Sequence, residues 1–543
     1  MSPSNGLVCF TNCLLPLEDG SLIEKDLWID ERQGTILDAQ KTFFIRQERP
    51  DRIIDLGGNI LSPGLLDIQL NGAYGFDFSV YEGDDDAYRA GMQLVAEKIV
   101  ETGVTALVPT LITPNAYQTQ EKSLYPKLLR LLKPFSTANS ATLLGWHAEG
   151  PFLEYAKRGA HVPSFLLAAP DGIKSFEEVY GAENLADSED WLMSSDGTRI
   201  GVRMITAAPE IEGVMQSIGE LDKRGIVFSI GHSVATSDIA TGAVQHGARL
   251  ITHLFNAMPQ LHHRDPSIIG LLGASPHLSS SFSPITAHYP SLPPYNPAVS
   301  TSPVKTSPTG SPPVKALSRA ASTSSTTRSI HAKSEAFDDS MTPPQTPVLA
   351  ANRAAKFAPS GVVTPLSIGH SRKTSRPELH LEKGQIADME FERPFYGLIV
   401  DGIHSHPNSV RLAFSAYPEG CILITDAMKI LDPNLKDGIH EWRDGQRFVK
   451  EGDKLYLEGT NTLAGSVVTL DKCIRNFSRF TGCSLGEAIK CATYNPAKCL
   501  GIEHKKGTLR PGADADLVVL DRQGNVVSTW VKGREVWSRP QAA

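Results

Sequence analysis

The chain has 543 residues, which by length alone suggests roughly three to four domains of about 150 residues, although one α/β barrel can use roughly 250–400. Hydrophobic residues make up 41% and charged residues 21%, as in ordinary globular proteins, and the net charge of −8 excludes a general basic field for nucleic acid. No stretch approaches the roughly 18–20 apolar residues that span a bilayer, and no secretory signal opens the sequence, so we expect neither nucleic-acid nor membrane partners.

The seven cysteines are scattered and include no Cys-x-x-Cys pair. An odd, dispersed set argues against a disulfide scaffold or a cysteine-built zinc site and favours a reducing compartment. We therefore expect a cytoplasmic protein.

The first predicted elements are short β runs with turn signals in residues 7–60, of which 27–30 is the clearest. Similar runs occur near the other end, at 517–520 and 526–534. Neither end shows the alternation of strands and helices found between them. We therefore expect the two ends to meet in one small β-sandwich domain.

Between these ends, apolar strand-like runs alternate with helix-like stretches. The runs are 105–109, 142–146, 202–206, 226–230, 250–252, 396–400 and 421–425, and the helix-like stretches are 85–101, 121–132, 211–223, 236–246 and 408–415. Such alternation indicates a parallel sheet with both faces covered. Seven or more units over about 300 residues favour a (β/α)8 TIM-like barrel over an open sheet.

Residues 274–390 differ in composition from the rest. Sixteen of the 37 prolines lie between Pro276 and Pro377, and no Asp or Glu occurs from Pro266 to Ser334. A Ser/Thr/Pro-rich segment with few aromatic residues cannot bury enough apolar area to offset its chain entropy. We predict a disordered insertion, which the barrel tolerates because the entropy of closing a loop grows slowly with its length. Its Ser/Thr-Pro pairs make kinases expected partners of this insertion.

The predicted fold class is thus α/β: a (β/α)8 barrel, a small β domain built from both chain ends, and a long disordered insertion. The expected boundaries are 1–60 and 503–543 for the small β domain, 61–273 and 391–502 for the barrel, and 274–390 for the insertion.

Ionisable residues follow five of the predicted strands, where the catalytic groups of a barrel lie. They are His147 and Glu149, His232, His253, Asp401 and His404, and Asp426. One carboxylate and two imidazoles form a common zinc triad, and a further Asp can take a proton from water. Each residue alone has an ordinary interpretation: a lone His is usually structural, Glu149 can form a salt bridge, and Asp426 can cap a helix. Their recurrence at equivalent strand ends favours a site, although we expect His147 to point away from Glu149 and to be structural.

The order of motifs carries a family resemblance. The motifs are PGLLDIQLNG at 63–72, HAEGP at 147–151, GHS at 231–233, THLFNAM at 252–258, DGIH at 401–404 and TDA at 425–427. This order is similar to that of the amidohydrolase superfamily. Arg264 after HLFNAM, and LAGS at 463–466, resemble the N-acetylglucosamine-6-phosphate deacetylase family within it, over about residues 7–537.

The resemblance implies an enzyme that hydrolyses N-acetyl-D-glucosamine 6-phosphate to D-glucosamine 6-phosphate and acetate in amino-sugar catabolism. It implies one divalent metal ion per subunit, with zinc expected, and a homodimer. The implied site residues are the metal ligands Glu149, His232 and His253, the general base and acid Asp426, and the substrate contacts Ala160, His161, Asn256, Ala257, Arg264, His404, Leu463, Ala464 and Gly465. Arg264 and His404 would hold the phosphate end, His161 the sugar or the acetamide carbonyl, and 463–465 the acetyl side.

The first barrel strand departs from a common pattern of the superfamily. Many amidohydrolases carry His-x-His there and can bind two metals, whereas this chain has Gln69 and Asn71. Neutral amides are weak ligands for a divalent ion compared with imidazole, so a single metal is expected.

Two other functions stay open at this point. One is hydrolysis of cyclic amides by another member of the superfamily, a class that often uses His-x-His and a bridging lysine and needs no phosphate. The other is a non-catalytic scaffold whose insertion recruits partners. Retention of three ligand residues and Asp426 disfavours the scaffold. Whether His262, His263 or His406 join the site also stays open.

Overall fold

The structure is a computed structural model. It describes residues 5–112, 124–131, 139–159, 161–185, 201–275, 391–441, 447–460, 463 and 465–540. These residues belong to one compact unit formed by 1–284 and 387–543. The predicted insertion, from residue 276 onward, lies outside the described residues.

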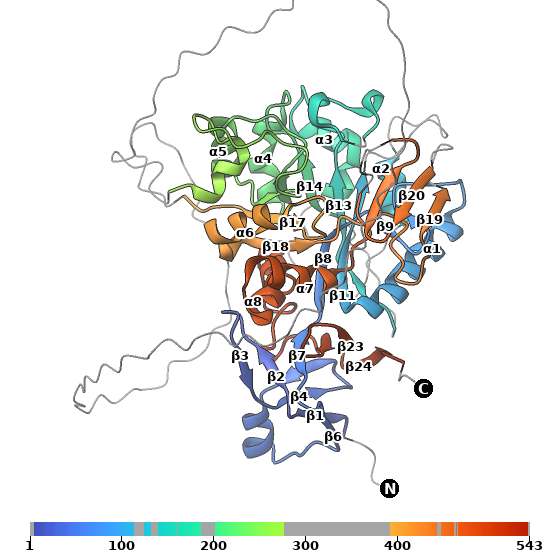
Figure 1. Ribbon diagram of the computed structural model, residues 1–543, viewed down its shortest axis with the longest axis vertical. Helices are drawn as coiled ribbons and strands as arrows, with labels where there is room; N and C mark the ends of the chain where they lie inside the picture. The colour runs from blue at the N-terminus through green and yellow to red at the C-terminus, as the bar shows by residue number, and fades with distance from the viewer. Residues whose placement is uncertain are drawn as a thin grey trace, which may run out of the picture. The chain divides into compact units, whose positions relative to one another are not determined.

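Eight parallel strands in the described ranges form a barrel (Figure 1). They are β8 (Leu65–Leu70), β11 (Val104–Ile112), β13 (Trp146–Glu149), β14 (Val202–Ala207), β15 (Val227–Ile230), β16 (Leu250–Ile251), β17 (Phe395–Ile399) and β18 (Cys421–Ile424). The barrel closes where Leu70 bridges Ala427 in parallel. There the Asp426 amide donates to the Gln69 carbonyl at 2.9 Å, and the Asn71 amide donates to the Ala427 carbonyl at 2.8 Å. The predicted (β/α)8 barrel is confirmed.

Helices lie between most of these strands. Their bounds are α1 (Asp85–Lys98), α2 (Tyr125–Leu131), α3 (Ile173–Tyr180), α4 (Val214–Lys223), α5 (Ser237–Gln245), α6 (Pro407–Ala416), α7 (Leu470–Thr481), α8 (Leu485–Lys490) and α9 (Tyr494–Leu500). The five predicted helix-like stretches correspond to α1, α2, α4, α5 and α6, whereas α3 and α7–α9 were not predicted. In α7 the buried residues Leu470, Cys473, Ile474 and Phe477 recur at helical spacing, so one face packs on the barrel. Ser484 and Glu487 form a capping box that starts α8.

Short helical turns connect several elements. They are the π-helical η1 (Lys41–Ile45) and the 3₁₀ turns η2 (Ile99–Thr102), η3 (Tyr155–Lys157), η4 (Pro163–Phe165), η5 (Ala182–Leu185), η6 (Ser267–Gly273) and η7 (Pro418–Gly420). None of the helices in the described ranges has both the length and the hydropathy needed to span a bilayer.

The two chain ends build two β-sheets (Figure 1). One has the order β5-β4-β1-β6, from β1 (Leu7–Thr11), β4 (Leu27–Asp30), β5 (Thr35–Leu37) and β6 (Arg52–Asp55). The other has the order β24-β23-β22-β7-β2-β3, from β2 (Leu14–Pro16), β3 (Leu22–Glu24), β7 (Ile60–Pro63), β22 (Leu517–Leu520), β23 (Val526–Val531) and β24 (Arg534–Ser538). A separate apolar core includes residues of both sheets, with Phe10 and Trp530 in edge-to-face contact at 5.1 Å. The predicted β-sandwich of both ends is confirmed.

The chain passes from the sandwich to the barrel within one residue, Gly64. A Cβ on Gly64 would lie 2.0 Å from Oγ1 of Thr105 on β11, so only glycine fits this close approach. Its amide donates to the Asp516 carbonyl at 2.8 Å, which ties the start of β8 to the returning C-terminal chain. The four domain boundaries given above stay predictions.

One strand boundary predicted from the sequence was wrong, and several small strands were not predicted. The run 142–146 is divided into β12 (Thr142–Leu143) and β13, because Gly145 at φ 100° interrupts it. Strand β13 continues to Glu149. The polar residues His147 and Glu149 point into the barrel, so the apolar run in the sequence ends before the strand does. The strands absent from the prediction are β9 (Gly72–Ala73), β10 (Phe76–Asp77), β19 (Gly438–Glu441), β20 (Arg447–Glu451) and β21 (Lys454–Leu457). They are short or exposed and carry no strong apolar pattern.

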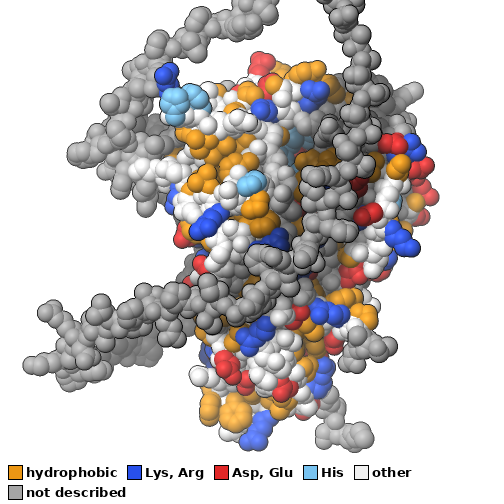
Figure 2. Space-filling view, viewed as in Figure 1, with side chains coloured by type: hydrophobic (Ala, Val, Ile, Leu, Met, Phe, Trp, Pro, Cys, Tyr) orange, Lys and Arg blue, Asp and Glu red, His pale blue; other side chains and the backbone are white. Residues whose placement is uncertain are grey.

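The small sheet β19–β21 packs beside the residues that follow β18. Phe448 and Leu455 share a buried cluster with Met428 and Ile430, and with Ile112 at the end of β11. This cluster supports the segment that begins at Asp426. On the face drawn in Figure 2, positive and negative side chains are interspersed without a continuous basic area.

Candidate metal centre

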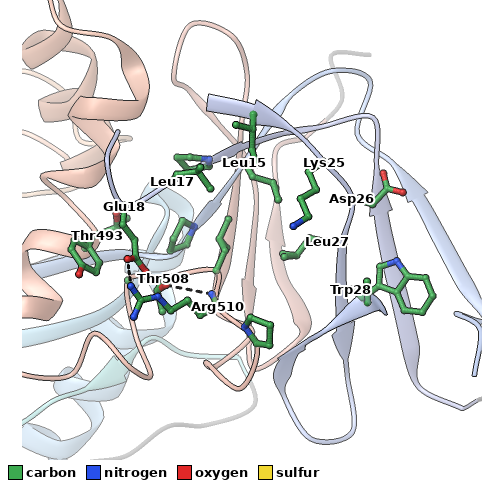
Figure 3. A pocket seen from close by; sticks show the side chains of 18 of the residues that line it. Leu15, Leu17, Glu18, Lys25, Asp26, Leu27, Trp28, Thr493, Thr508 and Arg510 are labelled. Atoms are coloured by element: carbon green, nitrogen blue, oxygen red, sulfur yellow. Dashed lines mark hydrogen bonds and ion pairs between the residues drawn. The ribbon is translucent and has the colours of Figure 1, made fainter. Parts of the chain in front are cut away.

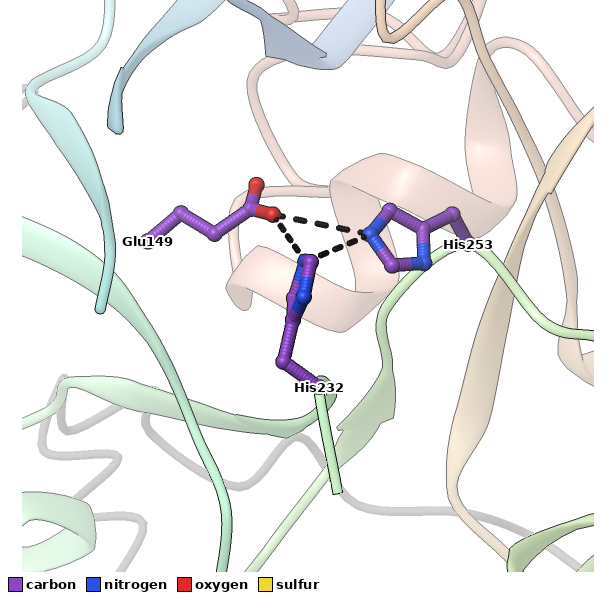
Figure 4. Close-up of side chains that lie close together, drawn as sticks. All are labelled: Glu149, His232 and His253. Carbon is purple, nitrogen blue, oxygen red and sulfur yellow. Dashed lines mark hydrogen bonds and ion pairs between the residues drawn. The ribbon is translucent and has the colours of Figure 1, made fainter. Parts of the chain in front are cut away.

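Three buried side chains converge at the carboxyl ends of the barrel strands (Figure 4). Glu149 ends β13, His232 follows β15 and His253 follows β16. Nε2 of His232 lies 2.7 Å from Oε1 of Glu149, and Nε2 of His253 lies 3.1 Å from Nε2 of His232. The distance from Nε2 of His253 to Oε1 of Glu149 is 3.5 Å. The structure therefore brings the three predicted metal ligands together.

The backbone turns sharply directly after these strands. His232, His253 and Asp426 have φ values of 50°, 27° and 47°, in the left-handed region that non-glycine residues seldom adopt. Such strain persists only where surrounding contacts fix it, and it concentrates at functional sites.

The protonation of His232 follows from its neighbours. Nδ1 lies 2.8 Å from the Lys157 carbonyl oxygen, which only accepts, so Nδ1 carries the proton. In the neutral ring the lone pair of Nε2 then faces the Glu149 carboxylate. A cation between these two atoms would be attracted by both electron pairs. Two imidazoles and one carboxylate are the ligand set of many catalytic zinc sites, so these residues fit a divalent metal.

The electrostatics of the triad agree with a cation site. Burial alone would raise the pKa of Glu149, but the imidazoles of His161, His232 and His253 hold that pKa well below its usual range. Burial alone would lower the pKa of His253, but the hydrogen bond and charge of Glu149 raise it to about 9. The carboxylate thus stays ionised and attracts positive charge to this point.

Asp426 lies next to the triad and is held by the first barrel strand. Asn71 Nδ2 donates to Asp426 Oδ1 at 2.8 Å. Gln69 Nε2 donates to the same oxygen at 3.3 Å and to Glu149 Oε2 at 3.1 Å, so it bridges Asp426 and the triad. Burial, and then the Glu149 charge, raise the pKa of Asp426. From the sequence, Gln69 and Asn71 were noted only because they stand where many amidohydrolases have histidines. Their hydrogen bonds to Asp426, more than 350 positions away, could be found only in the structure.

Two further predicted residues lie beside this group. Nε2 of His161 is 3.6 Å from Oε1 of Glu149, and its ring packs edge-on against that of His232 at 4.8 Å. Nδ1 of His404 lies 2.6 Å from Oδ2 of Asp401, and the charge of His404 lowers the pKa of Asp426. Both histidines are therefore within electrostatic reach of the centre.

The loop after β16 carries the next predicted contacts. The Asn256 amide donates to the His253 carbonyl at 2.9 Å, and the Ala257 carbonyl accepts from the Ser233 amide at 3.2 Å. This second bond ties the loop to the segment after His232. Arg264, further along, is exposed, and its guanidinium has no hydrogen-bond or ion-pair partner in the ranges given above.

The 463–465 segment lies against the residues after β18. Leu463 bridges Tyr456 of β21, and the Ser466 amide donates to the Asp426 carbonyl at 3.4 Å. Gly465 has φ 83°, and a Cβ on it would lie 2.4 Å from Cγ of Met428, so this close approach requires glycine. The predicted contacts Ala160 and Ala464 lie outside the described residues.

The predicted orientation of the His147 side chain, away from Glu149, was wrong. Its ring is fully buried and contacts Oγ1 of Thr110 at 3.3 Å and Oγ1 of Thr206 at 2.7 Å. Residues two apart on a strand share a face, so His147 points into the barrel below Glu149. Strand alternation in the sequence was sufficient to show this.

The three histidines left open lie at the surface. His262 and His263 are exposed and pack ring to ring at 4.3 Å. His406 caps α6 by accepting from the Asn408 amide at 3.1 Å, which explains its position without a role in the site.

A separate hollow of about 690 Å³ lies between the small β domain and the segment that joins α8 to α9 (Figure 3). Its lining includes Leu15, Leu27, Trp28 and the hydrogen-bonded side chains of Glu18, Thr508 and Arg510. Its lining includes neither the triad nor Asp426, so it is distinct from the metal centre.

Comparison with known proteins decides the family. Residues 370–536 match the model of the amidohydrolase family. The chain is 33% identical to N-acetylglucosamine-6-phosphate deacetylase of Danio rerio, over 98% of this chain and 96% of that protein. It is 34% identical to the enzyme of the same name from Homo sapiens, again over 98% and 96%.

The chain belongs to the N-acetylglucosamine-6-phosphate deacetylase family. The resemblance seen in the motifs is confirmed. A solved structure of a mutant of the Mycobacterium smegmatis deacetylase, in complex with N-acetyl-D-glucosamine-6-phosphate, covers 99% of this chain and 100% of its own. With a TM-score of 0.61 and 21% identity, it shows that the family fold is shared.

Proposed function

We propose that this chain hydrolyses the acetamide of N-acetyl-D-glucosamine 6-phosphate to D-glucosamine 6-phosphate and acetate, a step of amino-sugar catabolism. Identity of 33–34% to deacetylases over nearly the whole chain supports this reaction. The observation that carries it is the position of Asp426 beside the Glu149–His232–His253 triad, with Gln69 hydrogen-bonded to both.

Glu149, His232 and His253 are the proposed ligands of one divalent metal, and zinc is the proposed ion. A divalent metal held there supplies a Lewis acid for the amide carbonyl and makes water a stronger acid near neutral pH. Zinc accepts imidazole and carboxylate in tetrahedral sites with one position left for water or substrate, which this triad leaves open.

Asp426 is the proposed general base and then general acid. Oδ1 accepts from Asn71 and Gln69, whereas Oδ2 has no hydrogen-bond partner among the described side chains and can take the proton of the attacking water. Because burial and Glu149 raise its pKa, the carboxyl can hold that proton until the amine leaves. His161, beside Glu149, is the proposed donor to the carbonyl oxygen as negative charge develops.

The phosphate end of the sugar is assigned to Arg264 and His404, with Asn256 and Ala257 between that end and the metal. Arginine suits phosphate because its planar guanidinium can donate two parallel hydrogen bonds. Leu463, Ala464 and Gly465 are the proposed wall on the acetyl side, and Ala160 accompanies His161. Binding at the phosphate then positions the amide at the metal.

The homodimer, kinases acting on the 274–390 insertion, and a cytoplasmic location stay proposals. The dimer rests on the family resemblance and the kinases on the Ser/Thr-Pro pairs. The location rests on seven cysteines, none of which forms a disulfide.

Acetate release from N-acetyl-D-glucosamine 6-phosphate, compared with release from unphosphorylated N-acetylglucosamine, tests the function. We expect zinc-loaded protein to hydrolyse the phosphorylated sugar with much the higher kcat/KM. No acetate from the phosphorylated sugar, or hydrolysis of a cyclic amide instead, would overturn the proposal.

Arg264→Ala should weaken recognition of phosphate selectively. A charge-assisted hydrogen bond contributes about 1.5–3 kcal/mol, so kcat/KM for the phosphorylated substrate should fall by roughly one to two decades. Activity on the unphosphorylated sugar should change little. Arg411→Ala, which removes an exposed arginine of α6, is the matched control. Equal losses for the two sugars would show that Arg264 does not contact phosphate.

Elemental analysis should find one tightly bound metal per chain. Asn71 and Gln69 use their amide groups to hold Asp426 and are poor metal ligands, so a second ion lacks imidazoles on β8. One equivalent of zinc should restore full activity to the metal-free chain. The double variant Gln69→His/Asn71→His should raise the metal content towards two. Two retained ions in the unaltered chain, with activity rising to the second equivalent, would contradict the prediction.

A further inference from the structure

A chain of buried polar side chains crosses the barrel interior one layer below the metal centre. Nε2 of His147 lies 2.7 Å from Oγ1 of Thr206, which lies 2.7 Å from Oγ1 of Thr252. Oγ1 of Thr252 lies 2.5 Å from Oγ of Ser229. We call these four residues the polar chain. All four are at most 1% exposed.

The polar chain departs from the usual filling of a barrel. Bulky branched apolar side chains dominate the interior layers of such barrels. A buried hydroxyl or imidazole is tolerated when it is hydrogen-bonded, and each member of the polar chain is bonded to the next. The strands already pair through their main chains, so these side-chain bonds are additional to what the fold requires.

The strands joined by the polar chain are those that carry the three proposed ligands. His147 precedes Glu149 by two residues on β13, and Ser229 on β15 precedes His232 by three. Thr252 directly precedes His253, and Thr206 on β14 links the two sides. Each proposed ligand therefore extends from a strand that the polar chain hydrogen-bonds to another strand of the barrel.

The polar chain also reaches β8, the strand at whose end Gln69 and Asn71 hold Asp426. Nδ1 of His147 contacts Oγ1 of Thr110 on β11, which accepts from the Leu70 amide at 3.1 Å. Leu70 lies between Gln69 and Asn71, whose side chains hold Asp426.

We infer that the polar chain positions the metal ligands, with Thr206 as its central link and His147 as its end on β13. Metal affinity depends on ligand atoms being held within a few tenths of an ångström, and partners outside the ligand set supply that constraint. The inference rests on the proposed metal centre. A wild-type chain that binds no zinc would refute that centre, whereas the variants below test the polar chain itself.

Thr206→Val keeps the shape of the side chain and removes the central hydroxyl. We expect its zinc dissociation constant, measured by competition with a chromophoric chelator, to rise about 10-fold or more. Thr206→Ser retains the hydroxyl and should bind zinc within about threefold of wild type.

Thr105→Val is the matched control, because Thr105 is a fully buried barrel threonine whose hydroxyl has no hydrogen-bond partner in the described structure. Its zinc affinity should not change. The unfolding temperature of each metal-free variant, measured by calorimetry, separates a loss of stability from a loss of ligand positioning.

Unchanged zinc affinity in Thr206→Val, or equal losses in Thr206→Val and Thr206→Ser, would overturn the inference. A loss of the same size in Thr105→Val would also overturn it. If Thr206→Val does not fold, Ser229→Ala decides, since it removes one hydroxyl at the end of the polar chain. Wild-type affinity in folded Ser229→Ala would then contradict the positioning role.

Discussion

Asp426→Asn is expected to lower kcat by about 10²–10⁴-fold while zinc and substrate remain bound, because general acid–base catalysis contributes in that range. Asparagine keeps the oxygen that accepts from Asn71 and Gln69 and replaces only Oδ2, the proposed proton acceptor. Steady-state kinetics with N-acetyl-D-glucosamine 6-phosphate, zinc content and substrate binding by calorimetry together measure the result.

The choice of asparagine follows from the backbone. Asp426 has φ 47°, a conformation that asparagine adopts readily and alanine seldom adopts, so the substitution adds no strain. Asp432→Asn, six residues further along, is the matched control and should retain wild-type turnover. Near-normal kcat in Asp426→Asn would remove this residue from the chemistry.

Lys506→Ala is expected to cost about 3–5 kcal/mol of stability, since it leaves the buried carboxylate of Asp516 without its ammonium partner. Lys506 is 3% exposed, and its Nζ lies 2.5 Å from Asp516 Oδ2 and 2.8 Å from Asp514 Oδ2. Burial alone would lower the pKa of Lys506, but the charges of Asp516 and Asp514 raise it. Asp516 also accepts from the Lys532 amide and, through its carbonyl, from the Gly64 amide, so this group joins the barrel to the β-sandwich.

Urea unfolding followed by circular dichroism measures that loss. Lys498→Ala, which removes an exposed lysine of α9, should change stability by less than about 0.5 kcal/mol. Lys506→Met combined with Asp516→Asn should recover part of the loss, because no ammonium and one fewer carboxylate are then buried. A loss in Lys506→Ala no larger than in Lys498→Ala would show that the ion pairs contribute nothing.

The candidate ligands could be read from the sequence because of a property of parallel barrels. The carboxyl ends of all strands meet at one face, so Glu149, His232, His253 and Asp426 need only lie at the ends of barrel strands to converge. The exact end of β13 could not be read in the same way. Polar residues that face a site end an apolar run before the strand itself ends.

The sequence alone determined the alternation of strands and helices, the two distinct chain ends and the residue types of the proposed metal triad, because local hydrophobic pattern and strand position encode them. Only the tertiary structure decided the pairing of β7 with β22, the hydrogen bonds from Gln69 and Asn71 to Asp426, and the links from His147 through Thr206 to Thr252. These contacts join residues tens to hundreds of positions apart. Their partners depend on barrel closure and strand register, which no local stretch of sequence specifies.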